Sequence, residues 1–454
     1  MKNSARLLLT LLTVALIVFV GALTYALIPT HTRPIASSQP PHSDAASIER
    51  GRYLAVAADC AACHTAPGGK PFAGGFALDS PLGAIYSTNI TPDKDSGIGN
   101  FTLDDFDRAV RHGIDDEGAT LYPAMPYPSY AFMSDEDIAA LYDYCMHAVA
   151  PVSSRVHANG IPWPLSIRWP LAIWRKLFAP SADAAPFNAS RYTDPVVARG
   201  AYLVEGPGHC GTCHTPHAVT LQEKALDDSS SVFLSGGQRI GGWTAVNLRG
   251  NRADGLGDWS KEDIVETLRT ARNPQQAVVG APMNDVVVHS TQYLSDADLQ
   301  AIAAYLKTLT PSPGDRSTFV ANPATAAALA AGHEANRGAE LYVDNCAACH
   351  RTDGEGSPKA LPKVAGNSSV LTQDPSSLIS LVLAGSSLPA TAAAPSPLGM
   401  PGFGWRLTNE EVAQLLTFIR SSWGNHAPGV SAGEVARVRG ALDAQSLAKT
   451  SSSD

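Results

Sequence analysis

Six of the seven cysteines in this 454-residue chain belong to three copies of one short motif, in which two cysteines stand three positions apart and a histidine follows at once. The copies are Cys60-Ala61-Ala62-Cys63-His64, Cys210-Gly211-Thr212-Cys213-His214 and Cys346-Ala347-Ala348-Cys349-His350. Composition alone predicts about 0.003 such motifs in a chain of this length. Chance therefore does not explain the three motifs, and we expect the fold to be organised around them.

This spacing is the attachment signal of a c-type haem. Both thiols lie on one helical turn, where they can form thioethers to the two vinyl groups, and the histidine presents its imidazole to the iron from the same side. A thioredoxin-like dithiol would need a single motif between strands. Structural zinc would need two motifs close enough to share four ligands, whereas these stand 150 and 136 residues apart. We therefore expect three covalent haems on the six cysteines.

Each motif lies within a longer repeat. A glycine preceded by arginine stands 8 to 10 residues before the first cysteine, at Gly51, Gly200 and Gly338. Segments 97–101 and 255–259 each open an amphipathic helical pattern. Each unit closes with a capping-box-like helix start followed by an apolar helix. These starts are at Ser134, Ser295 and Thr408, and the helices should end near His147, Leu309 and Ile419.

The spacing of apolar residues indicates an all-α fold. No alternating strand pattern of any length is present, so we expect short helices joined by long loops rich in glycine and proline. Such loops are too long for a conventional helical bundle. The haem should therefore fill the middle of each unit.

Methionine is the expected sixth ligand of the iron, because it raises the reduction potential and favours electron transfer over oxygen chemistry. The chain has only six methionines. One in each repeat lies in a proline-containing loop between the haem motif and the closing helix: Met125, Met283 and Met400. Met133 competes with Met125, but it directly precedes the Ser134 cap, where an apolar residue normally packs against the helix. We therefore favour Met125.

The remaining cysteine and four histidines receive no ligand role. Cys145 matches Leu306 and Ile419 when counted from the helix caps, so a buried, inert thiol is expected. Two histidines without counterparts in the other units are expected at the surface, His112 and His147. Two others flank the second motif and are assigned no role, His209 and His217.

The N-terminus predicts a membrane helix. Lys2 and Arg6 precede an uncharged run of 22 residues from Leu7 to Ile28, which at ~1.5 Å per residue would span a ~30 Å hydrocarbon core. A cleaved signal peptide is the alternative, but no Ala-x-Ala site follows closely, so an uncleaved anchor is favoured. Either way the positive flank stays in the cytoplasm and the bulk of the chain is exported. The net charge of −9 argues against nucleic acid as a partner.

The combination of motifs resembles the triheme cytochrome c subunits of bacterial membrane-bound dehydrogenases of the alcohol, gluconate, sorbitol or aldehyde type. Besides the haem motifs, the matching stretches are 89–92, 122–130, 168–178, 243–250 and 400–405, within about residues 47–440. The resemblance implies that His64, His214 and His350 are proximal ligands and that Met125, Met283 and Met400 are distal ones.

The same resemblance implies a division of labour. A separate subunit carrying pyrroloquinoline quinone, flavin or a molybdenum cofactor oxidises the substrate, and the cytochrome, with no substrate-oxidising site of its own, passes the electrons to ubiquinone. The expected location is the periplasmic side of the inner membrane. Some relatives are held by C-terminal segments, whereas the one credible span here is N-terminal.

The predicted architecture is three tandem class I cytochrome c-like domains after a membrane helix. Its segments are a signal or anchor helix (1–29), a tether (30–46), domain 1 (47–150), an aromatic, proline-rich connector (151–190), domain 2 (191–314), a linker (315–330), domain 3 (331–424) and a polar C-terminal tail (425–454). The connector holds Trp163, Trp169, Trp174 and Phe178. These aromatics could rest on the bilayer, contact quinone, meet the partner subunit or pack between haem domains.

Two alternative functions remain at this point. A multihaem peroxidase would need at least one open or histidine-ligated iron, which the methionine in every repeat argues against. The cytochrome module of a terminal oxidase would deliver electrons to oxygen, but such modules more often carry one or two haems.

Overall fold

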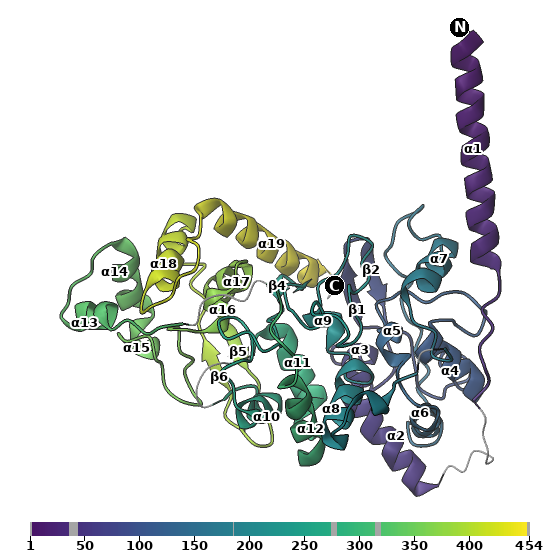
Figure 1. The fold of residues 1–454 in the computed structure, drawn as a ribbon, viewed down its shortest axis with the longest axis horizontal. Coiled ribbons are helices and arrows are strands. Elements are labelled where there is room, and N and C mark those ends of the chain that lie inside the picture. Colours follow the sequence, from purple (N-terminus) through teal and green to yellow (C-terminus); the bar gives the residue numbers. More distant parts are fainter. Residues whose placement is uncertain (1, 36–43, 185, 274–278, 314–318, 452–454) are drawn as a thin grey trace. The chain divides into compact units, whose positions relative to one another are not determined.

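The computed structural model describes residues 2–35, 44–184, 186–273, 279–313 and 319–451. Helices dominate this part of the chain, and its strands form three short antiparallel pairs, β1–β2, β3–β4 and β5–β6 (Figure 1). The expected all-α class is confirmed. The chain divides into two compact units, Met1–Asn188 and Ala189–Asp454, and each is described by itself.

The first unit contains the N-terminal helix and the first haem motif. Its elements are α1 (Lys2–Leu27), α2 (Ala45–Ala57), α3 (Cys60–His64), β1 (Ala77–Ser80), β2 (Gly83–Tyr86), α4 (Leu103–His112), α5 (Tyr127–Tyr130), α6 (Asp135–His147) and α7 (Trp169–Phe178). Within the described residues, one segment is long and apolar enough to cross a membrane, Arg6–Leu27 of α1. Its apolar side chains are largely exposed.

The second unit contains the other two haem motifs. The elements around the second motif are η1 (Ala189–Arg191), α8 (Pro195–Glu205), α9 (Gly211–His214), β3 (Arg239–Ile240), β4 (Trp243–Thr244), α10 (Lys261–Thr270), α11 (Ala281–His289), η2 (Thr291–Tyr293) and α12 (Asp296–Leu306). Those around the third are α13 (Ala324–Ala330), α14 (Arg337–Asn345), α15 (Ala347–His350), α16 (Ser368–Leu371), α17 (Ser376–Ala384), β5 (Ser386–Leu388), β6 (Leu398–Met400), α18 (Asn409–Ser421) and α19 (Ala432–Ser451).

The helix before each haem motif crosses the closing helix of the same repeat at the repeated glycine. A β-carbon on Gly51 would stand 1.9 Å from the carbonyl oxygen of Ala140 in α6. The corresponding distances are 1.9 Å from Gly200 to the Ala301 oxygen in α12, and 2.4 Å from Gly338 to the Gln414 oxygen in α18. The facing residue is the sixth after the helix cap in all three repeats. Only glycine permits this close approach of two backbones.

An ion pair joins the same two helices in each repeat. The arginine before the glycine contacts the acidic residue at the third position of the closing helix, in the pairs Arg50–Asp137, Arg199–Asp298 and Arg337–Glu411. The backbone N–H of each acidic residue donates to the capping hydroxyl of Ser134, Ser295 or Thr408, so the three predicted helix starts are confirmed.

Two parts of the structure differ from the sequence-based expectation. The three strand pairs were not expected, because strands of two to four residues are too short for alternation to be visible. Part of the expected polar tail is instead the helix α19, in which Val435 and Val438 are buried in the core around the third motif. Arg439 donates to the carbonyl oxygens of Gly404 and Leu407, which holds α19 against that core.

Candidate haem sites

Each haem motif forms a single helical turn directly after the first helix of its repeat, at α3, α9 and α15. The chain reverses into the first two turns through residues with positive φ, Asp59 (φ 51°) and His209 (φ 37°). All six motif cysteines are free of disulfide bonds. One helical turn therefore presents two thiols and one imidazole, as thioether attachment to a porphyrin requires.

The imidazole of each motif is held in one orientation by a backbone carbonyl. The Nδ1 atom lies 2.7 Å from the Thr88 oxygen for His64, 2.8 Å from the Val246 oxygen for His214 and 2.8 Å from the Pro362 oxygen for His350. A carbonyl can only accept, so Nδ1 carries the proton and donates it, which leaves the lone pair on Nε2 for a metal. Burial also lowers the pKa of all three histidines, which favours the neutral ligand form. The residues therefore fit a haem iron.

A glycine with positive φ donates to the backbone of the histidine in each haem motif, and the sequence analysis did not find it. The N–H of Gly74 donates to the His64 oxygen (2.8 Å), that of Gly236 to the His214 oxygen (2.7 Å) and that of Gly356 to the His350 oxygen (3.2 Å). Their φ angles are 71°, 76° and 58°. The distance in sequence from histidine to glycine differs in every repeat, which hid the common role.

Asparagine side chains position the carbonyls that hold the first two histidines. The Oδ1 atom of Asn89 accepts from the Thr91 N–H (2.9 Å), and Oδ1 of Asn247 accepts from the Arg249 N–H (2.8 Å). Each asparagine directly follows the residue whose carbonyl accepts from the histidine, Thr88 or Val246. These asparagine turns fix the local backbone and so orient the hydrogen bond to the imidazole.

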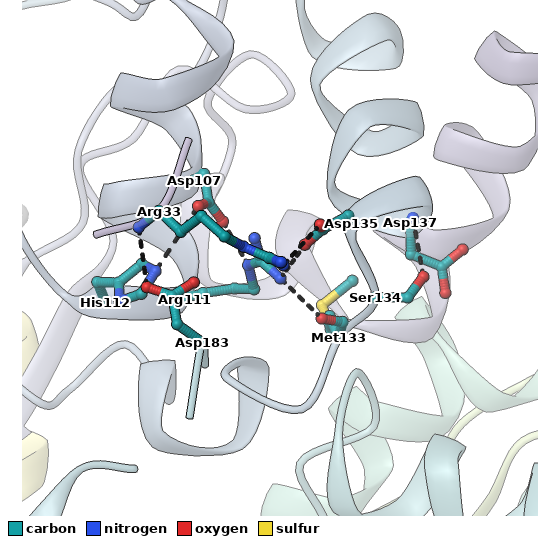
Figure 2. Close-up of polar contacts among 9 residues, drawn as sticks. All are labelled: Arg33, Asp107, Arg111, His112, Met133, Ser134, Asp135, Asp137 and Asp183. Atoms are coloured by element: carbon teal, nitrogen blue, oxygen red, sulfur yellow. Dashed lines mark hydrogen bonds and ion pairs between the residues drawn. The ribbon is translucent and has the colours of Figure 1, made fainter. Parts of the chain in front are cut away.

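Met125 and Met133 occupy different environments in the first unit. Met125 lies in the turn between Tyr122 and Tyr127 and is half-buried beside the core of this unit. Met133 is only 2% exposed and belongs to that core itself. The Met133 carbonyl accepts a hydrogen bond from the buried Arg111 (3.2 Å; Figure 2). The packing of Met133 agrees with a structural role, and the assignment of Met125 as the ligand stays a prediction.

The other two methionines do not lie in loops, so that expectation is wrong. Met283 is in the first turn of α11, because Pro282 suits the start of a helix. Met400 ends β6 and pairs with Ser386 of β5. Both are half-buried, and Met400 packs against the core around the third motif. Their roles as iron ligands likewise stay predictions.

His112 is buried, which contradicts its expected place at the surface. Its Nε2 lies 3.6 Å from the carboxylate of Asp107, which also accepts from Arg111 (Figure 2). Burial opposes ionisation of Asp107, but the nearby His112 and the hydrogen bond from Arg111 lower its pKa overall. Arg111 extends the network to Asp135 at the start of α6 (2.8 Å). The one-turn spacing of Asp107 and Arg111 was the sequence signal for this buried cluster.

The structure confirms two other expectations about residues outside the ligand set. Cys145 is 4% exposed, and burial raises the pKa of its thiol to about 12. His147 is exposed at the end of α6. Near the second motif, His209 is half-buried with its Nδ1 atom 2.9 Å from the Pro207 oxygen, and His217 is half-buried as well. Within the described residues, no three His, Cys, Asp or Glu side chains gather into a site for a bare metal ion.

The repeated turn, with two thiols and a neutral imidazole oriented through Nδ1, defines a protein that binds haem covalently at three places. The family model described as cytochrome c matches residues 48–148, 197–310 and 335–423. The chain belongs to the cytochrome c family, and it carries three covalently bound c-type haems.

The chain is similar along most of its length to cytochrome subunits of known dehydrogenases. It is 53% identical to the gluconate 2-dehydrogenase cytochrome c subunit of Pantoea cypripedii over 87% of this chain and 90% of that protein. It is 50% identical to the alcohol dehydrogenase (quinone) cytochrome c subunit of Gluconacetobacter polyoxogenes, over 89% and 86% respectively. It is 38% identical to the fructose dehydrogenase cytochrome subunit of Gluconobacter japonicus, over 93% and 88%. The resemblance noted from the sequence is thus confirmed.

Proposed function

We propose that this chain is the electron-transfer subunit of a membrane-bound dehydrogenase complex, and that it passes electrons from a catalytic subunit to ubiquinone at the periplasmic face of the inner membrane. The observation that carries the proposal is the threefold recurrence of one ligand arrangement, His64, His214 and His350 each bonded through Nδ1 to a carbonyl. The relatives, named as cytochrome subunits of gluconate, alcohol and fructose dehydrogenases, support it.

The protein contributes fixed ligands and shielding to these sites. Each haem supplies reversible one-electron chemistry at its iron. The carbonyl bonds at Nδ1 hold the three imidazoles in one orientation, which would limit the structural change when an iron bound there gains or loses an electron. Met125, Met283 and Met400 would each hold one haem iron through a thioether and would raise its reduction potential.

The proposed anchor is α1, retained in the mature protein. Its apolar segment of 22 residues is long enough to span a bilayer. Lys176 of α7 donates to the carbonyl oxygens of Tyr25 (2.6 Å) and Ile28 (2.7 Å) at the C-terminal end of α1. These carbonyls have no partner inside the helix, so Lys176 caps it. A segment integrated in this way supports an uncleaved anchor over a cleaved signal peptide.

The two alternative functions are disfavoured by separate observations. A multihaem peroxidase needs an iron with an open or histidine-ligated sixth position, and each repeat offers a half-buried methionine instead. A terminal oxidase module is disfavoured because the three relatives described above are named as subunits of dehydrogenases. Each of them aligns with at least 87% of this chain.

The test is electron transfer by the complex that co-purifies with the tagged chain. Gluconate, ethanol and fructose are offered in turn to the oxidised complex, and haem reduction is followed by absorbance. A water-soluble ubiquinone analogue is then added without oxygen. The proposal expects that one substrate reduces the haems and that the quinone reoxidises them. Reoxidation by hydrogen peroxide but not by quinone would favour the peroxidase, and co-purification with a copper–haem subunit would favour the oxidase module.

A further inference from the structure

Four large apolar side chains between residues 163 and 177 of the connector are exposed. Trp163 is 81% exposed, Leu165 53%, Ile167 40% and Leu177 61%. We call these four residues, with the outer side of α7, the interfacial face. Water-exposed apolar side chains of this size in one short segment mark a surface that contacts something else.

The two charged residues of α7, Arg175 and Lys176, both donate to groups at or just after the C-terminal end of α1. They are therefore compatible with an apolar contact surface on the other side of α7. The guanidinium of the buried Arg175 donates to the Thr30 hydroxyl (2.7 Å), just after α1. Lys176 caps the C-terminal carbonyls of α1. The rest of the helix is Trp, Pro, Leu, Ala, Ile and Phe. Its exposed positions, Pro170 and Leu177, lie seven residues apart and therefore on one side of the helix.

The contact between α7 and α1 indicates how deep this face lies. The ring of Trp169 packs edge-on against Phe19 of α1, with 5.8 Å between ring centroids (Figure 1 shows the two helices). Phe19 lies eight residues before the end of α1 at Leu27, or about 12 Å along the axis. The apolar segment is about 33 Å long and the hydrocarbon core about 30 Å thick. Trp169 therefore lies about 10 Å along α1 from the C-terminal end of its apolar segment, at the level of Phe19.

We propose that the interfacial face is a second membrane-binding surface, which lies in the outer leaflet where headgroups meet acyl chains. The inference rests on the proposed anchoring by α1. α7 runs along α1 from the level of Ile28 at Lys176 to the level of Phe19 at Trp169, so its Trp169 end reaches about 10 Å below the level where the apolar segment ends. Tryptophan is also the side chain enriched at this boundary. A protein partner would have to enter the bilayer to cover the Trp169 end of α7.

This surface places the first haem site next to the membrane. Trp174 of α7 contacts the ring of the buried Tyr127, with 6.3 Å between centroids. Tyr127 follows Met125 by two residues, and its N–H donates to the Met125 oxygen (2.8 Å). One layer of side chains therefore separates the loop that carries Met125 from the helix that lies on lipid.

The experiment uses the complex in liposomes that contain a phospholipid with a photoactivated diazirine on its acyl chain. After illumination, lipid adducts are located by mass spectrometry of peptides. The proposal expects adducts on both α1 and residues 163–178. Adducts on α1 alone would overturn it and leave the anchoring intact, and so would cross-links from residues 163–178 to the dehydrogenase subunit in place of lipid. Adducts on neither segment would overturn the anchoring as well.

A variant and its control sharpen the result. The variant Trp163→Ser/Leu165→Ser/Leu177→Ser should lower the adduct yield on residues 163–167 at least about fivefold, because their largest exposed apolar side chains are lost, while the yields on α1 and on Trp169, which packs against it, are unchanged. The control Val219→Ser/Trp405→Ser removes apolar side chains that are 100% and 85% exposed in the other unit. It should leave both yields unchanged. An equal haem absorbance per chain in all samples shows that the variants fold, and a control that lowers the yield as much as the variant does would contradict the proposal.

Discussion

Gly200 of α8 lies directly against the main chain of Ala301 in α12, and a β-carbon at Gly200 would stand 1.9 Å from the Ala301 carbonyl oxygen. The obstacle is backbone, so no change of rotamer can relieve it. The two helices that frame the second haem site can accept a larger residue only by moving apart.

The substitution Gly200→Ala should therefore lower the free energy of unfolding of this unit by about 3 kcal/mol. Urea unfolding followed by circular dichroism of the haem band measures the change. The control is Gly440→Ala in the helix α19, where an added β-carbon meets nothing within 4 Å among the described residues. It should change stability by at most about 1 kcal/mol, in the stabilising direction. Equal effects at both positions would contradict the account of the helix crossing.

A neighbouring pair of glycines tests how His214, the histidine of the second haem motif, is held. Gly236 and Gly237 both have positive φ, 76° and 87°. A β-carbon on Gly236 would stand 2.6 Å from the Asn247 nitrogen, whereas on Gly237 it meets nothing within 4 Å in the described part of the chain. Gly236 alone bonds to the His214 oxygen. Gly236→Ala should therefore shift the reduction potential of one haem, and Gly237→Ala should cost only the backbone strain of about 1 kcal/mol. Potentiometric titration should show one shifted potential in the Gly236→Ala protein and unchanged potentials in the Gly237→Ala protein.

Replacement of Met125 and of Met133 should have opposite signatures. Met125→Ala should lower one of the three reduction potentials and remove one methionine–iron charge-transfer band, because the iron loses its thioether ligand. Met133→Ala should keep that band and lower the free energy of unfolding by about 2–5 kcal/mol, because it empties a core position. Near-infrared absorbance and urea unfolding of both proteins provide the comparison. Loss of the band in the Met133 variant alone would reverse the assignment.

Glu205 should make the stability of the second unit depend on pH. Its carboxyl group is buried and accepts from the Tyr305 hydroxyl (2.6 Å), and burial raises its pKa from 4.5 to about 7 despite that bond. The folded state therefore prefers the protonated acid. The associated stability is fully present below pH 4.5 and is lost as the pH rises through about 7.

The raised pKa of Glu205 should lower the free energy of unfolding by about 3 kcal/mol as the pH rises through this range. Glu205→Gln, which keeps an acceptor for Tyr305, should remove that part of the pH dependence and stabilise the protein at pH 8 relative to wild type. Urea unfolding between about pH 5 and pH 8 measures both curves. The exposed Glu334→Gln serves as the control and should follow wild type. A Glu205→Gln curve parallel to wild type would show that this carboxyl does not titrate as proposed.

The sequence was sufficient for the parts of the fold that depend on local chemistry. The caps at Ser134, Ser295 and Thr408 were predictable because a hydroxyl three residues before an acid satisfies the first N–H groups of a helix. The buried state of Cys145 followed from its place on the apolar side of the closing helix. The three haem motifs were visible because their chemistry requires a fixed spacing.

What could not be predicted depends on long-range contacts. The carbonyls that hold the imidazoles come from 12 to 32 residues away in sequence, at a different distance in each repeat. His112 is buried beside Asp107, which Arg111 also contacts, and no single position of the sequence reveals this grouping. Most apolar residues of the helix α19 are alanines, and its burial depends on the core that Val435 and Val438 meet.

The most direct test of the central claim is the intact mass of the denatured chain, together with its count of reactive thiols. With all six motif cysteines in thioethers, the mass should exceed that of the polypeptide by three haems, and an alkylating reagent in urea should modify one thiol, that of Cys145. In the folded protein that thiol should not react, because burial raises its pKa to about 12. A mass increase of fewer than three haems, or two or more reactive thiols in urea, would contradict the account.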